Sequence, residues 1–184
     1  MIYRFLIISD EVENFMREIQ LDASATFLDF HRLIVKACGY EDNQITFFTI
    51  CERGWEKGED ITLEEMDGYT GRRSRVMADT ELSECLEDEK QHLLYTFDTL
   101  ADRVLFIELA QIIHGKNLKD GKISRSIGDA PQQVLDFDEM LARNPVSSTD
   151  SSLSTGDDLY GSEVDASEID LEGLTSAMTF RGDL

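Results

Sequence analysis

The stretch that decides the fold is Leu21-Asp-Ala-Ser-Ala-Thr-Phe-Leu-Asp-Phe-His-Arg-Leu-Ile-Val-Lys-Ala-Cys-Gly-Tyr40. It predicts one core helix that ends near Cys38, because start and stop signals bracket an apolar stripe. Thr26 suits the N-cap, and Asp29 can return a hydrogen bond to the cap in the manner of a capping box. Gly39 supplies the left-handed stop. The stripe at helical spacing consists of Phe27, Phe30, His31, Ile34 and Cys38.

Extended, β-rich runs flank this helix. Strands are predicted at residues 3–9, 15–21, 45–51, 93–98 and 103–113. The first two and the last two would form hairpins around polar turns, and residues 61–63 look like a short extended piece. We therefore predict an α+β domain: a mixed or antiparallel sheet of about five strands with one main helix packed across it, in a β-grasp-like layout.

Three further segments carry weaker signals. Residues 79–86 can form one or two helical turns, with Leu82 and Leu86 facing inward. Residues 114–131 show little periodicity, as expected of an excursion or an edge segment. Residues 134–143 can form a short helix.

Charge and composition divide the 184 residues into two regions, 1–143 and 144–184. The first carries 29 acidic and 16 basic side chains and has the apolar content of a folded domain. The second is rich in Ser, Thr and Asp and carries 9 acidic side chains against 1 basic. We expect it to be an acidic C-terminal tail, largely disordered.

The formal net charge of −21 constrains the partners of the chain. Such a field repels nucleic-acid phosphates and anionic membrane surfaces and attracts cationic proteins. No apolar run approaches the length of about 18 residues that spans a bilayer, and the first residues do not resemble a signal peptide. Cys38, Cys51 and Cys85 are odd in number and widely spaced. That pattern favours free thiols and a reducing cytoplasm.

Motifs for catalysis, metals and cofactors are weak throughout the chain. Gly115 to Ile123 resembles a P-loop only superficially, because its spacing is wrong and Ile123 stands where Ser or Thr is needed. Cysteine and histidine pairs at zinc spacing are missing, and the acidic clusters lack EF-hand spacing. His31 is expected to be a buried structural histidine, with His92 and His114 at the surface or at strand edges. We predict no metal site and no cofactor.

Three segments together carry a family resemblance. They are Thr26 to Tyr40, the hairpin Tyr95-Thr-Phe-Asp-Thr-Leu-Ala-Asp-Arg-Val-Leu105, and Gly128-Asp-Ala-Pro-Gln-Gln133. Over roughly residues 1–133 the chain resembles the Ri-plasmid ORF-3-like family, often found on mobile or plasmid DNA. The resemblance implies an α+β sheet domain and no secure biochemical activity. Leu100, Arg103 and Leu105 replace the glycine, tryptophan and histidine of the family hairpin.

Two features remain as candidate interaction sites. The dense basic patch Arg72, Arg73 and Arg75 can dock an acidic partner or the chain's own tail, or it can pair with surrounding acids. The tail carries apolar residues at approximate helical spacing, which suits a segment that folds on binding to a groove; an inert solubilising tail is the alternative. These tail residues are Val164, Leu171, Leu174 and Met178.

The leading functional hypothesis is a cytoplasmic, non-enzymatic interaction module whose acidic surface and tail bind a basic protein. The alternative is a divalent-metal-dependent hydrolase or nuclease-like enzyme of mobile-element origin, with Asp98 and Asp102 as acid groups in the hairpin turn. A third hypothesis is a homodimer whose sheet edges pair. Direct binding to nucleic acid and to membranes is not expected.

Overall fold

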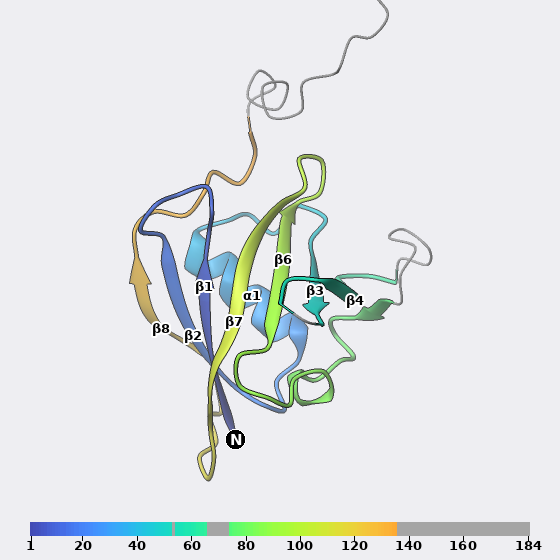
Figure 1. Cartoon of the computed structure of the whole chain (residues 1–184), viewed down its shortest axis with the longest axis vertical. Helices are drawn as coiled ribbons and strands as arrows, with labels where there is room; N and C mark the ends of the chain where they lie inside the picture. Colours follow the sequence, from blue (N-terminus) through green and yellow to red (C-terminus); the bar gives the residue numbers. More distant parts are fainter. Residues whose placement is uncertain (53, 66–73, 136–184) are drawn as a thin grey trace, which may run out of the picture. The chain divides into compact units, whose positions relative to one another are not determined.

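All strands of the described chain belong to one sheet (Figure 1). The structure is a computed structural model, and it describes residues 1–52, 54–65 and 74–135. The sheet has eight strands in the order β5-β4-β3-β6-β7-β1-β2-β8. The strands are β1 (Ile2–Ile8), β2 (Met16–Asp22), β3 (Phe47–Cys51), β4 (Lys57–Thr62), β5 (Ser74–Val76), β6 (His92–Asp98), β7 (Arg103–Ile113) and β8 (Lys122–Ile127).

The helix α1 (Phe27–Cys38) forms where the capping signals predict it. Thr26 Oγ1 accepts a hydrogen bond from the Asp29 amide at 3.2 Å, and the Asp29 carboxylate accepts one from the Thr26 amide at 3.2 Å. These two bonds satisfy amides that the first turn leaves without intrahelical partners. Gly39 ends the helix with φ 72°, a left-handed conformation that glycine adopts without strain. The predicted helix is confirmed.

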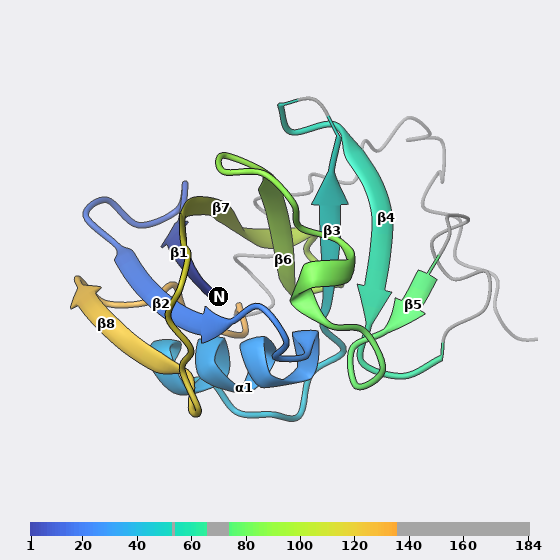
Figure 2. The same ribbon diagram turned by 90° about the horizontal axis from the view of Figure 1, so that it is seen from below.

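The core lies between α1 and one face of the sheet. Phe30 stacks against Phe5 of β1 at a ring distance of 4.3 Å and against Phe48 of β3 at 5.3 Å. Ile34, one turn further along the helix, is fully buried in the same cluster. Figure 2 shows the helix running along a single side of the curved sheet.

Both predicted hairpins are present. β1 pairs with β2 in antiparallel register, with Phe5 opposite Ile19, and β6 pairs with β7 with Tyr95 opposite Leu105. β1 also pairs with β7, so the two hairpins are joined at the centre of the sheet although they are far apart in sequence. Buried and less buried residues alternate along β1, β2 and most of β7, as expected for strands with one face buried, whereas the five inner residues of β6 are all buried.

The expected fold class is wrong. The structure is mostly sheet, with eight strands instead of about five, and α1 is the one α-helix of the described residues. The additional strands are β4, β5 and β8, which lie at or next to the two edges of the sheet. β5 and β8 are edge strands with few buried residues and therefore little apolar alternation. β4 lies inside the sheet, but its sequence is largely polar, and only its end, Ile61 and Thr62, falls in the short extended piece expected at residues 61–63. The β-grasp-like layout is replaced by a wide sheet with a helix on one side.

The weaker predictions have mixed outcomes. A single turn of 3₁₀ helix, η1 (Leu82–Glu84), forms within residues 79–86, and Leu82 and Leu86 are both fully buried, as expected. The predicted helix over 134–143 lies outside the described residues except for its first two, which are not helical. The tail and the boundary after residue 143 also lie outside them. None of the helices described is long and apolar enough to cross a membrane.

Candidate functional site

Asp98 and Asp102, the predicted acid groups, have different surroundings. Asp98 Oδ1 accepts hydrogen bonds from the amides of Leu100 and Ala101, at 3.1 and 3.2 Å, so this carboxylate holds the β6–β7 turn in shape. Asp102 has a φ of 50°, is largely exposed and forms an ion pair with Lys57 at 3.6 Å. The first carboxylate is already used in the turn, and the second is paired with a lysine of β4.

Arg103 is the centre of a buried ion cluster at this end of the sheet. Its Nε and Nη2 donate to the two carboxylate oxygens of Glu11 at 2.9 and 2.7 Å, a bidentate geometry. Its Nη1 lies 3.5 Å from Asp98 and 3.4 Å from the carbonyl oxygen of Gln133. The guanidinium, 3% exposed, also lies over the ring of Phe97 at 4.7 Å.

The charge of Arg103 is maintained by its partners. Burial opposes the charged form, but the hydrogen bonds and charges of Glu11 and Asp98 outweigh it and raise the pKa of Arg103 above its usual value. The cluster therefore joins the β1–β2 turn, the β6–β7 hairpin and the segment after β8. Sequence reasoning missed this role. The available signal was an arginine at the start of a strand whose next four residues are apolar.

His31 belongs to a second polar chain, which runs from the buried Tyr95 to the exposed Asp42. Its Nδ1 lies 2.8 Å from Tyr95 Oη, and its Nε2 lies 3.0 Å from Asp42 Oδ1. The imidazole is 1% exposed, and burial raises the pKa of Tyr95. Both ring nitrogens have partners, so the predicted structural histidine is confirmed. The arrangement of Tyr95, His31 and Asp42 fixes one side of α1 against β6.

All three cysteines are free thiols, as predicted. Burial raises the pKa of Cys38 to about 12, and it also raises the pKa values of Cys51 and Cys85. The nucleophilic form of cysteine is the thiolate, and a raised pKa keeps the thiol protonated. These residues are thus suited to packing and not to nucleophilic catalysis.

A hollow of about 830 Å³ lies beside the first turn of α1, between β2 and the β7–β8 loop. Leu21 and Leu33 form apolar parts of its lining, and Asp22, Arg32 and Lys119 supply charges of both signs. Burial opposes ionisation of Asp22, but hydrogen bonds from the backbone of Leu118 and from Ser24 lower its pKa below the usual value. Asp22, at the end of β2, thus holds the β7–β8 loop in place by accepting a hydrogen bond from the Leu118 amide.

Metal-ligating groups do not gather within the part of the chain that the structure describes. No set of three or more histidine, cysteine, aspartate and glutamate side chains lies close enough there to hold a metal ion. His92 stacks on Trp55 instead, with ring centroids 4.1 Å apart, and its Nε2 lies 3.5 Å from Glu108.

The predicted basic patch is only partly described. Arg75, in β5, forms ion pairs with Glu59 and Glu84, both at 3.2 Å. The hydrogen bond and charge of Glu59 are the main reason that the pKa of Arg75 is raised. This pairing agrees with the alternative interpretation of the patch, in which its arginines pair with surrounding acids. Arg72 and Arg73 lie outside the described residues, as do the predicted tail residues Val164, Leu171, Leu174 and Met178.

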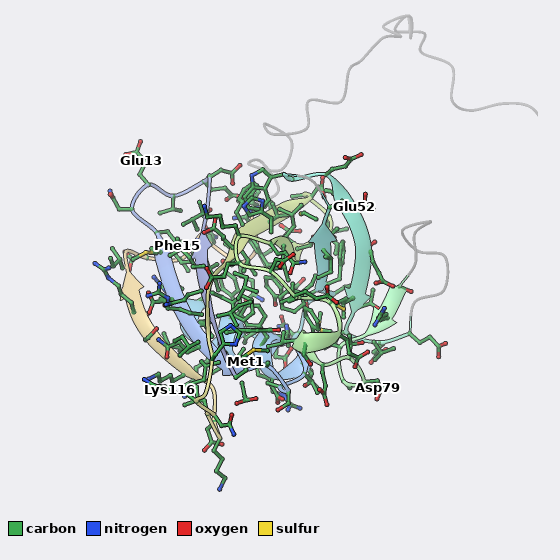
Figure 3. All side chains as sticks on the ribbon, turned by 60° about the horizontal axis from the view of Figure 1, so that its bottom comes forward. Met1, Glu13, Phe15, Glu52, Asp79 and Lys116 are labelled. Atoms are coloured by element: carbon green, nitrogen blue, oxygen red, sulfur yellow. The ribbon has the colours of Figure 1, made fainter. Side chains whose placement is uncertain are left out.

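Charge is unevenly distributed over the described surface. Residues 79–89, around η1, carry six acidic side chains and no basic one, and all six residues are exposed. Residues 114–127, which comprise the β7–β8 loop and β8, carry four basic side chains and one acidic one. Asp79 and Lys116 mark these two regions, and Figure 3 shows them on opposite sides of the domain. We call residues 79–89 the acidic segment.

Comparisons with known proteins agree with the resemblance seen in the sequence. The model of the plasmid pRiA4b ORF-3-like protein family matches residues 2–133. Among solved structures, the crystal structure of a protein of unknown function from Methanosarcina mazei Go1 is similar, with a TM-score of 0.54 and 19% sequence identity over 68% of each chain. At this identity the likeness concerns the fold alone. A search of curated proteins found no match.

Proposed function

Since the chain belongs to the plasmid pRiA4b ORF-3-like family, whose description names no activity, we propose a function from the chain's own surface. It is a non-enzymatic interaction module whose acidic surface binds a basic protein partner. We also propose that the module is cytoplasmic, which its three free cysteines support.

The observation that carries this proposal is the acidic segment. Its six carboxylates follow one another along a short stretch that is anchored at Leu82 and Leu86, both fully buried. Leu82 and Leu86 fix the backbone, so the exposed carboxylates before, between and after them have a defined position on the surface. A fixed cluster of like charges produces a local field that speeds the association of an oppositely charged surface.

The sign of the field determines the class of partner. With a net charge of −21, the chain repels phosphate-bearing ligands, whereas Lys- and Arg-rich surfaces are attracted. Residues 144–184 add 9 acidic side chains against 1 basic and form a second binding element in this proposal. An acidic, apolar-striped tail of this kind can fold on a partner's groove.

Affinity capture with full-length chain from native lysate, at low and high salt, tests the proposal. We expect a retained protein with a basic surface that is lost at high salt, because salt screens exposed charges. The informative variant neutralises two exposed residues of the acidic segment, Glu87→Gln with Asp88→Asn. Its matched control, Asp10→Asn with Glu13→Gln, removes the same charge from the exposed β1–β2 turn.

The two variants separate a local site from a general charge effect. Reduced capture by the first variant and normal capture by the control would support the acidic segment as the docking site. Equal reduction in both would mean that net charge alone attracts the partner, and no reduction in either would contradict the proposal. Deletion of residues 147–184 tests the tail in the same assay, and unchanged capture would remove its recruiting role.

A further inference from the structure

The side of the sheet away from α1 carries an apolar row outside the core cluster that contains the buried residues of α1. In register, Ile127 lies opposite Met16, Met16 opposite Ile8, Ile8 opposite Phe106, and Phe106 opposite Leu94. Residues directly opposite in adjacent strands point to the same side of a sheet. The row therefore crosses five neighbouring strands: β8, β2, β1, β7 and β6.

Sequence neighbours of the row face α1, and adjacent residues of a strand point to opposite sides of the sheet, so the row faces away from α1. Ile7 and Tyr95, next to Ile8 and Leu94, are fully buried in the core cluster with α1. In Figure 1 the helix lies behind β1, β7 and β6, and no described helix covers their near side. We call this side of β8, β2, β1, β7 and β6 the open face.

Large apolar side chains are exposed on the open face. Ile8 is 45% exposed and Ile127 is 37% exposed, Met16 and Phe106 are half-buried, and Leu94, at the β6 end of the row, is 4% exposed. Trp55, from the β3–β4 connection, is 43% exposed and packs edge-on against Phe106 at a ring distance of 5.0 Å. An apolar row of this width on a soluble domain marks an interaction surface.

The open face carries little net charge, unlike the rest of the chain. The next row, by register, contains Arg125, Glu18, Leu6, Glu108 and His92. The row beyond it contains Lys122, Gln20, Arg4 and Gln111. Three bases thus stand against two acids, with Arg4 and Glu18 3.8 Å apart. A strongly basic partner has no electrostatic reason to choose this face over the acidic segment.

We propose that the open face is the interface of a homodimer in which two sheets pack face to face across a two-fold axis. A two-fold interface must be complementary to itself. An apolar row flanked by both signs of charge meets that condition, since it can place apolar against apolar side chains and bases against acids. Low charge also matters because two chains of −21 repel one another elsewhere. Aligned sheet packing supplies the geometry.

The edges of the sheet are less suitable for self-association. β8 carries the bases Lys122 and Arg125 and no acidic residue, so two-fold pairing of β8 with β8 would bring four like charges into one pair of strands. β5, at the opposite edge, has only three residues. The homodimer is thus assigned to the face and not to the edges, and it does not depend on the basic partner proposed above.

Sedimentation of the full chain at micromolar concentration tests the homodimer. We expect the wild type to sediment as a dimer, more so at higher salt, because salt screens the repulsion between the two chains. Ile8→Glu and Ile127→Glu should each weaken dimerisation about tenfold or more, because they place a charge in the apolar row. Ile45→Glu is the matched control, since Ile45 is 52% exposed and lies before β3, outside the row.

The variants make the outcome unambiguous. Ile127 lies in the edge strand β8, where a substitution disturbs the fold less than in the central strand β1. Ile127→Glu therefore keeps the test valid if Ile8→Glu unfolds the domain, and melting curves show which variants are folded. A wild type that is monomeric at every salt concentration would overturn the proposal. So would a dimer unaffected by both variants, or one weakened equally by Ile45→Glu. A monomer that loses a captured basic protein on Ile8→Glu would assign the open face to that protein and also overturn the homodimer.

Discussion

At the scale of single residues, one buried ionic cluster holds three segments of the chain together. Arg103 connects three segments through Glu11, Asp98 and the carbonyl oxygen of Gln133. A buried charge that loses its partner costs more than the pair contributes, because the remaining charge is left in a medium of low dielectric constant. Arg103 therefore has a structural function of its own.

Arg103→Met should lower the free energy of unfolding by about 3–5 kcal/mol, because it leaves Glu11 and Asp98 without their cation. Arg103→Lys should recover part of the loss, since lysine keeps the charge but not the bidentate fork. Urea denaturation measures both variants. Arg32→Met, at an exposed position, is the control and should change stability by less than about 0.5 kcal/mol. A loss below about 1 kcal/mol for Arg103→Met would contradict the proposed role of the cluster.

Asp22 should contribute stability at neutral pH that disappears in acid. Its pKa is lowered in the folded chain, so its contribution is complete above the pKa of the unfolded chain, about 4, and is lost as the pH falls through the folded value. Melting of the wild type and of Asp22→Asn should differ at pH 7, and the difference should shrink as the pH falls below about 4. A difference that persists in acid would mean that the carboxylate charge is not the cause.

At the scale of elements, local signals were sufficient for α1 and insufficient for the edge strands. The Thr26 cap, the apolar stripe and Gly39 lie within a few turns of one another, and the predicted bounds of the helix hold. β8 has mostly exposed residues and no apolar alternation, and its pairing with β2 joins residues more than a hundred positions apart. No local pattern encodes such a pairing. The sequence therefore predicted about five strands, three fewer than the sheet contains.

Ile34→Ala tests the packing of α1 at this scale. Ile34 is fully buried, and truncation should lower the free energy of unfolding by about 2–5 kcal/mol, because it removes buried methyl groups and leaves a cavity. Lys36→Ala, exposed in the last turn of the helix, should have an effect of less than about 0.5 kcal/mol. Thermal melting compares the two. Equal shifts would show that the helix does not pack as described.

At the scale of the whole molecule, the two proposed surfaces lie on different parts of the fold. We expect rising salt to weaken binding at the acidic segment and to strengthen dimerisation through the open face. From the sequence we could predict that a binding surface would be acidic, because the excess of acidic residues is visible in the composition. The sequence did not show that the acidic segment would be this surface. Its position around η1 depends on where Leu82 and Leu86 are buried. The contact of Arg103 with Glu11 joins residues 92 positions apart, so only the folded chain shows it.

The most direct test of the interaction module is the affinity of the full-length chain for its captured partner, measured by titration over a range of salt concentrations. We expect the affinity to fall steadily as salt rises, and neutralising Glu87 and Asp88 should make this dependence shallower than in the wild type, because fewer charges contribute. An affinity that is independent of salt, or a salt dependence unchanged in this variant, would contradict the acidic segment as the binding surface.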